Sequence, residues 1–203
     1  MTTFALLSDT HGRHRQVEVP EADVLIHAGD FTRSGGLGDV EEFDDWLAGL
    51  PHPTKIVVAG NCDGCCEMNP EAVRRRLTQA RYVQDESIEV DGLTVWGSPW
   101  QPVFLNMSFN LERGEALAEK WAEMPDEIDI LVTHGPPRGI LDETSRGEVV
   151  GDRELLARVT EVRPKLHVFG HVHESSGREE RAETTFVNAA CDTASKSPVV
   201  VEV

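Results

Sequence analysis

Short apolar runs recur along the chain, and five of them end in residues that can bind metal ions. We expect buried strands over residues 3–8, 23–28, 55–59, 129–133 and 166–169, because each run is short, apolar and closed by polar or turn-forming residues. The closing segments are Ser8-Asp9-Thr10-His11, Gly29-Asp30, Gly60-Asn61, His134-Gly135 and Gly170-His171-Val172-His173. Five strands that end in such residues favour one shared site at their carboxyl ends.

Helical spacing and turn signals fill the intervals between these runs. Helices are expected between Asp39 and Pro51, after Asn69-Pro70-Glu71, over residues 115–123 and after Asp152, with Asp39, Asn69 and Asp152 as N-caps. A hairpin around Asp91-Gly92 joins strands at 87–90 and 93–96, and further strands cover 184–188 and 198–203. This order predicts an α/β sandwich of two packed sheets with helices outside.

Composition places the chain among globular proteins. Its 203 residues, 39% hydrophobic and 27% charged, show no break in composition, so we expect one domain over residues 1–203. The apolar runs are too short to span a membrane, and the N-terminus lacks the pattern of a secretion signal. Together with only four cysteines, these features predict a reduced, cytoplasmic protein that does not associate with membranes.

The charge balance narrows the choice of partners. With 36 acidic and 19 basic residues, the formal charge is −17, and such a surface repels phosphate backbones. We therefore expect a small-molecule substrate rather than a nucleic acid. Only four of the basic residues are lysine, which fits either a salt-rich habitat or an ordinary acidic protein. The oligomeric state is not predicted.

Taken together, the strand ends supply seven oxygen and nitrogen ligands. They are Asp9, His11, Asp30, Asn61, His134, His171 and His173. Seven such groups suit two ions about 3.5–4 Å apart with one bridging carboxylate. Taken alone, Asp9-Thr10-His11 also fits a turn that Asp9 caps, and His27 inside its strand is interpreted as a core histidine.

Other candidates are weaker. His14 falls in a polar loop, where a solvated side chain is expected. The sequence Cys62-x-x-Cys65-Cys66 could form a zinc or redox knuckle, but it lacks a second cysteine pair to complete four ligands. The loop over residues 97–113 either forms a wall of the site or covers the core.

The ordered series Asp-x-His, Gly-Asp, Gly-Asn, His and Gly-His-x-His resembles the calcineurin-like metallophosphoesterases. The segments LVTHGPPRGIL (131–141), RPKLHVFGHVHE (163–174) and GSPW (97–100) are similar to the branch of metallophosphoesterase-domain-containing proteins. The resemblance implies a four-layer α/β/β/α sandwich with two mixed sheets. It also implies one ion held by Asp9, His11 and His173, and a second held by Asn61, His134 and His171. Asp30 would bridge the two ions.

The same resemblance implies a binuclear metal-dependent phosphoesterase that cleaves small phosphodiesters, with cyclic nucleotides as one candidate. A hydroxide bridging the ions would attack phosphorus, with Asp30, Asn61 and His134 central to the site. Manganese is favoured, with iron, zinc, cobalt and nickel as alternatives. A phosphomonoesterase, a nuclease and a non-catalytic protein-binding scaffold are the alternative functions.

One residue departs from the family pattern. Many members carry histidine after Gly-Asn as an acid near the leaving group, whereas this chain has Cys62 followed by Asp63. A neutral thiol is a weak proton donor, so acid catalysis worth about 10²–10⁴-fold could be missing, and no general acid is assigned. Cys62, His14 and Arg113 are the candidate substrate contacts.

Overall fold

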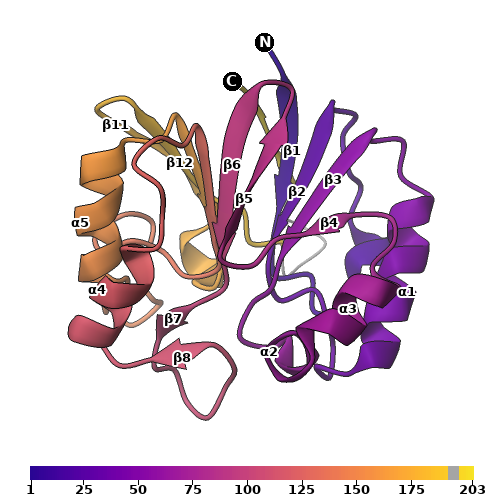
Figure 1. Ribbon diagram of the computed structural model, residues 1–203, viewed down its shortest axis with the longest axis horizontal. Coiled ribbons are helices and arrows are strands. Elements are labelled where there is room, and N and C mark those ends of the chain that lie inside the picture. The colour runs from indigo at the N-terminus through magenta and orange to yellow at the C-terminus, as the bar shows by residue number, and fades with distance from the viewer. Residues whose placement is uncertain (192–196) are drawn as a thin grey trace.

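Two β-sheets pack face to face, with helices on their outer faces (Figure 1). The computed structural model describes residues 1–191 and 197–203. The first sheet has the order β13-β1-β2-β3-β4, with β1 to β4 parallel and β13 antiparallel to β1. Its strands are β1 (Thr3–Leu7), β2 (Val24–Ala28), β3 (Thr54–Val58), β4 (Arg81–Tyr82) and β13 (Val199–Glu202).

The second sheet has the order β11-β12-β10-β9-β6-β5. Its inner pairs are parallel, and an antiparallel pair closes each edge, so this sheet is also mixed. Its strands are β5 (Glu86–Val90), β6 (Leu93–Ser98), β9 (Ile130–Thr133), β10 (Leu166–Phe169), β11 (Gly177–Arg181) and β12 (Thr184–Asn188). A short parallel pair, β7 (Gln101–Pro102) and β8 (Asn110–Leu111), lies near the carboxyl ends of the main strands (Figure 1).

Alternation along the strands explains the layers. In β1, Phe4 and Leu6 face the layer between the sheets, while Ala5 and Leu7 face the helices. Helices α1 (Leu37–Ala48), α2 (Gly64–Met68) and α3 (Pro70–Arg76) lie on the side of the first sheet, and α4 (Glu115–Trp121) and α5 (Arg153–Val162) cover the second (Figure 1). The expected four-layer sandwich with two mixed sheets is confirmed.

Two predicted helix caps are confirmed and one is wrong. The Asp152 side chain accepts a hydrogen bond from the Leu155 amide, and the Asn69 side chain accepts one from Ala72. Helix α1 begins earlier than expected, with Gly36 at the N-cap. Asp39 therefore lies in the first turn, where Oδ2 accepts hydrogen bonds from the amides of Ser34 (2.7 Å) and Arg33 (3.2 Å). It stabilises the loop before the helix.

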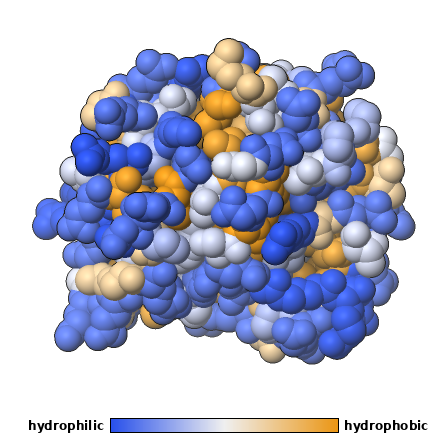
Figure 2. All heavy atoms as spheres, turned by 45° about the horizontal axis from the view of Figure 1, so that its top comes forward, coloured by the Kyte–Doolittle hydropathy of each residue, from blue (hydrophilic) through white to orange (hydrophobic). Residues whose placement is uncertain are grey.

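Parallel strands bring their carboxyl ends to one edge of each sheet, at the end of the molecule opposite the chain termini (Figure 1). The side that carries the termini is largely hydrophilic, with an apolar strip near its middle (Figure 2). Two 3₁₀ turns, η1 (His14–Gln16) and η2 (His173–Ser175), follow β1 and β10. Within residues 1–191 and 197–203, every helix is too short or too polar to cross a bilayer.

Candidate metal centre

The loops after β1, β2 and β10 hold four of the predicted ligands in unusual backbone conformations. Asp9, His11, Asp30 and His171 have φ values of 58°, 45°, 57° and 67°. A left-handed conformation costs a non-glycine residue roughly 1–3 kcal/mol and persists only where surrounding contacts enforce it. The fold therefore holds these residues at a backbone cost, as expected at a functional site.

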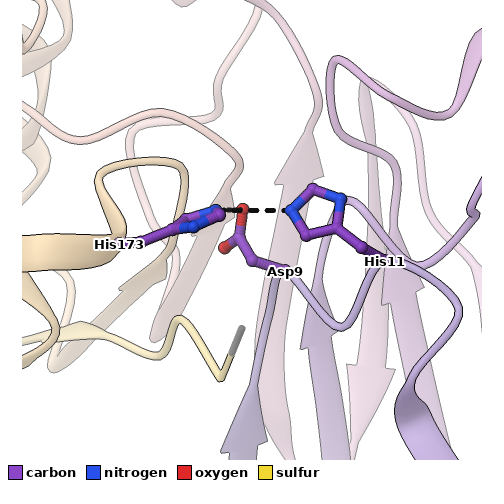
Figure 3. Close-up of side chains that lie close together, drawn as sticks. All are labelled: Asp9, His11 and His173. Carbon is purple, nitrogen blue, oxygen red and sulfur yellow. Dashed lines mark hydrogen bonds and ion pairs between the residues drawn. The ribbon is translucent and has the colours of Figure 1, made fainter. Parts of the chain in front are cut away.

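The first cluster joins the end of β1 to the end of β10. The rings of His11 and His173 approach the Asp9 carboxylate from the two sides of the sandwich (Figure 3). His173 Nε2 lies 3.1 Å from Asp9 Oδ1 and 3.3 Å from His11 Nε2. Their donor atoms are within 4.8 Å of one another, so these three residues can hold one cation.

The second cluster lies deeper, at the ends of β3 and β9. His134 Nδ1 is 3.0 Å from the carbonyl oxygen of Ala28 and can donate its proton there. Nε2 then faces Asn61 Oδ1 at 2.9 Å and Asp30 Oδ1 at 3.5 Å. A histidine that binds a metal characteristically donates its other ring proton to a carbonyl or carboxylate. This arrangement suits a cation among His134, Asn61 and Asp30.

Asp30 lies between the two clusters. Its carboxylate is 3.9 Å from His11 Nε2 as well as 3.5 Å from His134 Nε2. It belongs to two potential cation-binding groups, one with His11 and Cys62 and the other with Asp9 and His134. The amide of Cys62 donates a hydrogen bond to Asp30 Oδ1 (2.7 Å) and fixes its position. This central place suits the bridging role implied for Asp30.

His171 approaches the deeper cluster from β10. Its backbone amide donates a hydrogen bond to Asp9 Oδ2 (3.0 Å), and its ring centroid is 5.1 Å from that of His134. All seven predicted ligands thus lie around one region, contributed by both sheets. The carboxylate, amide and imidazole donors together fit divalent cations.

Glycines make this crowding possible. A methyl group on Gly60 would collide with Asp30 and with the His134 ring, and one on Gly170 would collide with Asp9 and Ser8. Gly29 has φ 102°, and a methyl group on it would collide with the His134 ring. The glycines of the Gly-Asp, Gly-Asn and Gly-His motifs are therefore needed for close approach.

The charges of the site are strongly coupled. Burial opposes ionisation of Asp9, but the hydrogen bond from His173 and the charges of His134 and His173 lower its pKa overall. Burial also opposes protonation of His134, while the charges of Asp30 and Asp9 outweigh it and raise its pKa. Burial and the charge of His134 lower the pKa of His171 to about 4. The cluster attracts positive charge, as a cation site must.

Sequence reasoning missed the role of Asp63, which it considered only as the neighbour of Cys62. This fully buried carboxylate accepts hydrogen bonds from the amides of Asp30 (2.9 Å), Thr32 (2.9 Å) and Gly60 (2.8 Å). Burial and the charge of Asp30 raise its pKa to about 7, against the opposing hydrogen bonds from Thr32. Asp63 ties the loop after β2 to the loop after β3. Its spacing two residues after Asn61 was the available signal.

The proposed substrate contacts are placed differently from one another. Cys62 and Arg113 line a cavity of about 470 Å³ that also exposes His11, Asp30, Asn61, His171 and His173. His14 does not line it. The expectation of a solvated His14 is wrong, because its ring is buried against Phe43 and Trp46 of α1, with centroids at 5.2 and 4.9 Å. Burial lowers the pKa of His14 to about 4.

Cys65 and Cys66 lie in α2, buried in the apolar layer between the first sheet and its helices. Neither belongs to a potential cation-binding group among the described residues. His27, by contrast, is the core histidine that the sequence indicated, with Nε2 3.0 Å from Thr10 Oγ1.

Comparison with known proteins agrees with this geometry. The profile of the calcineurin-like phosphoesterases matches residues 2–175. The chain belongs to the calcineurin-like phosphoesterase family. Within it, the human metallophosphoesterase domain-containing protein 1 is 43% identical over 223 residues, which cover 98% of this chain and 68% of that protein. A UPF0046 protein of Caenorhabditis elegans is 38% identical and covers 98% of this chain and 80% of its own length.

Solved structures of this fold are similar at much lower identity. An archaeal phosphodiesterase has a TM-score of 0.51 and 17% identity, with 98% of both chains covered. Another solved structure reaches a TM-score of 0.67 at 15% identity, covering 99% of this chain and 98% of its own. At these identities the likeness concerns the fold alone.

Proposed function

We propose that this protein is a binuclear metal-dependent phosphodiesterase that hydrolyses small phosphodiesters, with cyclic nucleotides as one candidate class. The observation that carries the proposal is the meeting of two donor clusters at one cavity. Asp9, His11 and His173 form the outer cluster, and Asn61 and His134 form the inner one. Asp30 lies within reach of both.

When bound, two divalent ions would supply an acidified water as nucleophile and neutralise charge that develops on the phosphoryl oxygens. Manganese is the ion we propose because the site adds carboxylate and amide oxygens to its imidazoles, and iron, zinc, cobalt and nickel are the alternatives. The chain's own part is to orient these groups. The Ala28 carbonyl fixes the His134 ring, and the Cys62 amide fixes the Asp30 carboxylate, so little reorganisation is needed during the reaction.

The charges along the cavity favour a diester over a more highly charged phosphate. Glu148 and Glu174 line the cavity, and both repel a second negative charge. Arg113 lines it too, but its guanidinium donates hydrogen bonds to the carbonyls of Gly151 (2.9 Å) and Val150 (2.5 Å). A diester carries one negative charge, whereas a monoester approaches two at neutral pH. These walls therefore support diester hydrolysis, and they offer little to a polyphosphate or nucleic-acid backbone.

Cys62 bears on which leaving groups can depart, because it occupies the position of a proton donor. It lines the cavity beside Asp30, and burial together with the charges of Asp30 and Asp63 raises the pKa of its thiol. The thiol remains protonated and is a poor acid toward an alkoxide. We therefore infer a preference for diesters whose leaving groups depart without help from a proton donor.

The direct test compares hydrolysis of bis-p-nitrophenyl phosphate with that of p-nitrophenyl phosphate, with Mn²⁺ and with EDTA. Faster, Mn²⁺-dependent cleavage of the diester is expected. The Asp30→Asn variant should lose this activity, while Asp126→Asn, which changes a side chain that is 90% exposed, should retain it. Faster cleavage of the monoester would indicate a phosphomonoesterase. Absence of metal-dependent turnover of either substrate would leave the protein-binding scaffold as the better function.

A further inference from the structure

Exposed apolar side chains gather at the mouth of the cavity. The large hydrophobic residues that are most exposed among the described residues are Met1, Met68, Val103, Phe104, Leu105, Val149 and Val200. Three of them are consecutive, Val103, Phe104 and Leu105, and all three line the cavity. Phe104 is 46% exposed and Leu105 is 74% exposed. On a chain of charge −17, a contiguous apolar surface at a binding cavity indicates a functional role.

The Asn110 side chain holds the segment Val103–Met107 between β7 and β8, together with a hydrogen bond from the Val103 amide to the Leu111 carbonyl (3.0 Å). The Asn110 amide oxygen accepts a hydrogen bond from the Phe104 amide (3.0 Å), and its nitrogen donates to the carbonyls of Leu105 (3.2 Å) and Met107 (3.0 Å). Leu105 has a left-handed φ of 51°. The exposed apolar side chains are thus presented by a loop that the Asn110 side chain fixes.

Phe104 connects this loop to the candidate metal centre. Its ring meets the ring of His171 edge to face, with centroids 5.1 Å apart. A group attached to a phosphate at the metal centre would therefore lie beside the partly exposed Phe104 ring. The acidic side chains of Glu148 and Glu174 also line the cavity, so a neutral substituent is favoured there over an anionic one.

We propose that the Val103–Met107 segment binds an aromatic ester group of the substrate, with Phe104 as the residue that determines this specificity. The inference rests on the proposed function, since it places the diester phosphate at the metal centre. A cavity of about 470 Å³ has room for a phosphate and one flat aromatic group. Aromatic rings prefer edge-to-face or offset contacts with other rings, and the exposed part of Phe104 offers such a surface.

The test measures binding rather than turnover. Two monoanionic ligands, methyl phenylphosphonate and methyl methylphosphonate, differ only in an aromatic or a methyl group on phosphorus. Their dissociation constants are measured by calorimetry with the full chain in Mn²⁺. The native protein should bind the phenyl compound about five- to tenfold more tightly. Phe104→Ala should abolish this ratio, and Phe104→Trp should keep it. Val200→Ala, an exposed apolar residue that does not line the cavity, serves as the matched control.

Each outcome decides the proposal. Loss of the phenyl preference in Phe104→Ala alone supports it. The proposal is overturned if the native protein shows no preference for the phenyl compound, or binds neither phosphonate. It is also overturned if the preference survives in Phe104→Ala. Hydrolysis of bis-p-nitrophenyl phosphate judges the phosphodiesterase function separately. Turnover without a Phe104-dependent preference refutes only the binding of an aromatic group by the Val103–Met107 segment. A Phe104-dependent preference without turnover refutes only the proposed phosphodiesterase activity.

Discussion

His167 in β10 should make the fold sensitive to mild acid. Its ring is fully buried beside Phe169 and Phe186. Nε2 lies 2.9 Å from the Thr133 hydroxyl, which itself donates to the Gly135 carbonyl, so Nε2 carries the proton and donates it to Thr133. Nδ1 has no hydrogen-bond partner within the described part of the chain. A second proton would therefore place a charge in apolar surroundings, and burial lowers the pKa of His167 to about 3.

The size of the effect follows from the two pKa values. In the unfolded chain the histidine titrates near 6.5, and in the folded protein near 3. Between these values the unfolded state binds a proton that the folded state does not, so stability decreases as the pH decreases. At pH 5, about 1.5 units below the unfolded pKa, the free energy of unfolding should be about 2 kcal/mol smaller because of this residue alone.

The assay is unfolding in urea, monitored by tryptophan fluorescence, at pH 7 and at pH 5 in the presence of EDTA. The His167→Gln variant keeps an N–H donor but does not titrate. The native protein should lose about 2 kcal/mol more than this variant between the two pH values. Other buried histidines, such as His14 and His27, are present in both proteins and cancel in the comparison. Losses that agree within about 0.5 kcal/mol, the usual limit of such additivity, would refute the reasoning.

Three further predictions concern the candidate metal centre. Gly60→Ala should weaken Mn²⁺ binding by about 10- to 100-fold in calorimetry while circular dichroism stays native, because the methyl group collides with Asp30 and His134. Gly38→Ala, where the added methyl group meets open space, should bind Mn²⁺ normally; equal binding by both variants would contradict the crowding argument. Cys62→His should speed cleavage of phenyl esters relative to p-nitrophenyl esters by about 10² or more, since an imidazolium donates a proton more readily than a thiol. An unchanged ratio would show that no acid was missing. Mn²⁺ at about 100 times its dissociation constant should raise the midpoint of thermal unfolding by about 5–10 °C, and Asp30→Asn should reduce this gain. An equal rise in that variant would place the ion elsewhere.

The long strands and the seven candidate ligands could be predicted because local sequence determines them, whereas the short strands β4, β7 and β8 and the polar edge strand β11 were not predicted. A short apolar run followed by Gly-Asp, Gly-Asn or Gly-His contains both the strand and the residue at its end. The parallel order of β1, β2 and β3, and of β9 and β10, then brings those ends together. We expected the candidate ligands to lie together from the strand pattern and from the family resemblance. This expectation did not require knowledge of how distant side chains pack.

The errors have a different origin. A polar neighbourhood made His14 resemble a surface residue, but α1 covers it with Phe43 and Trp46, which are far away in the sequence. Asp39 matched the N-cap preference, yet the helix begins at Leu37 and the carboxylate stabilises the preceding loop instead. Arg113 lines the cavity and stays a candidate substrate contact, but the hydrogen bonds of its guanidinium to two backbone carbonyls were not evident from the sequence. Each of these outcomes depends on tertiary contacts that a local pattern does not contain.

The left-handed backbone at Asp9, His11, Asp30 and His171 has a consequence for how ions enter and leave. Hydrogen bonds within the chain hold these residues, among them those from the Cys62 amide to Asp30 and from the His171 amide to Asp9, so a cation does not have to organise the loops by itself. Exchange of one divalent ion for another should then proceed without refolding. The identity of the ion in a cell would follow from supply and affinity rather than from the moment of folding.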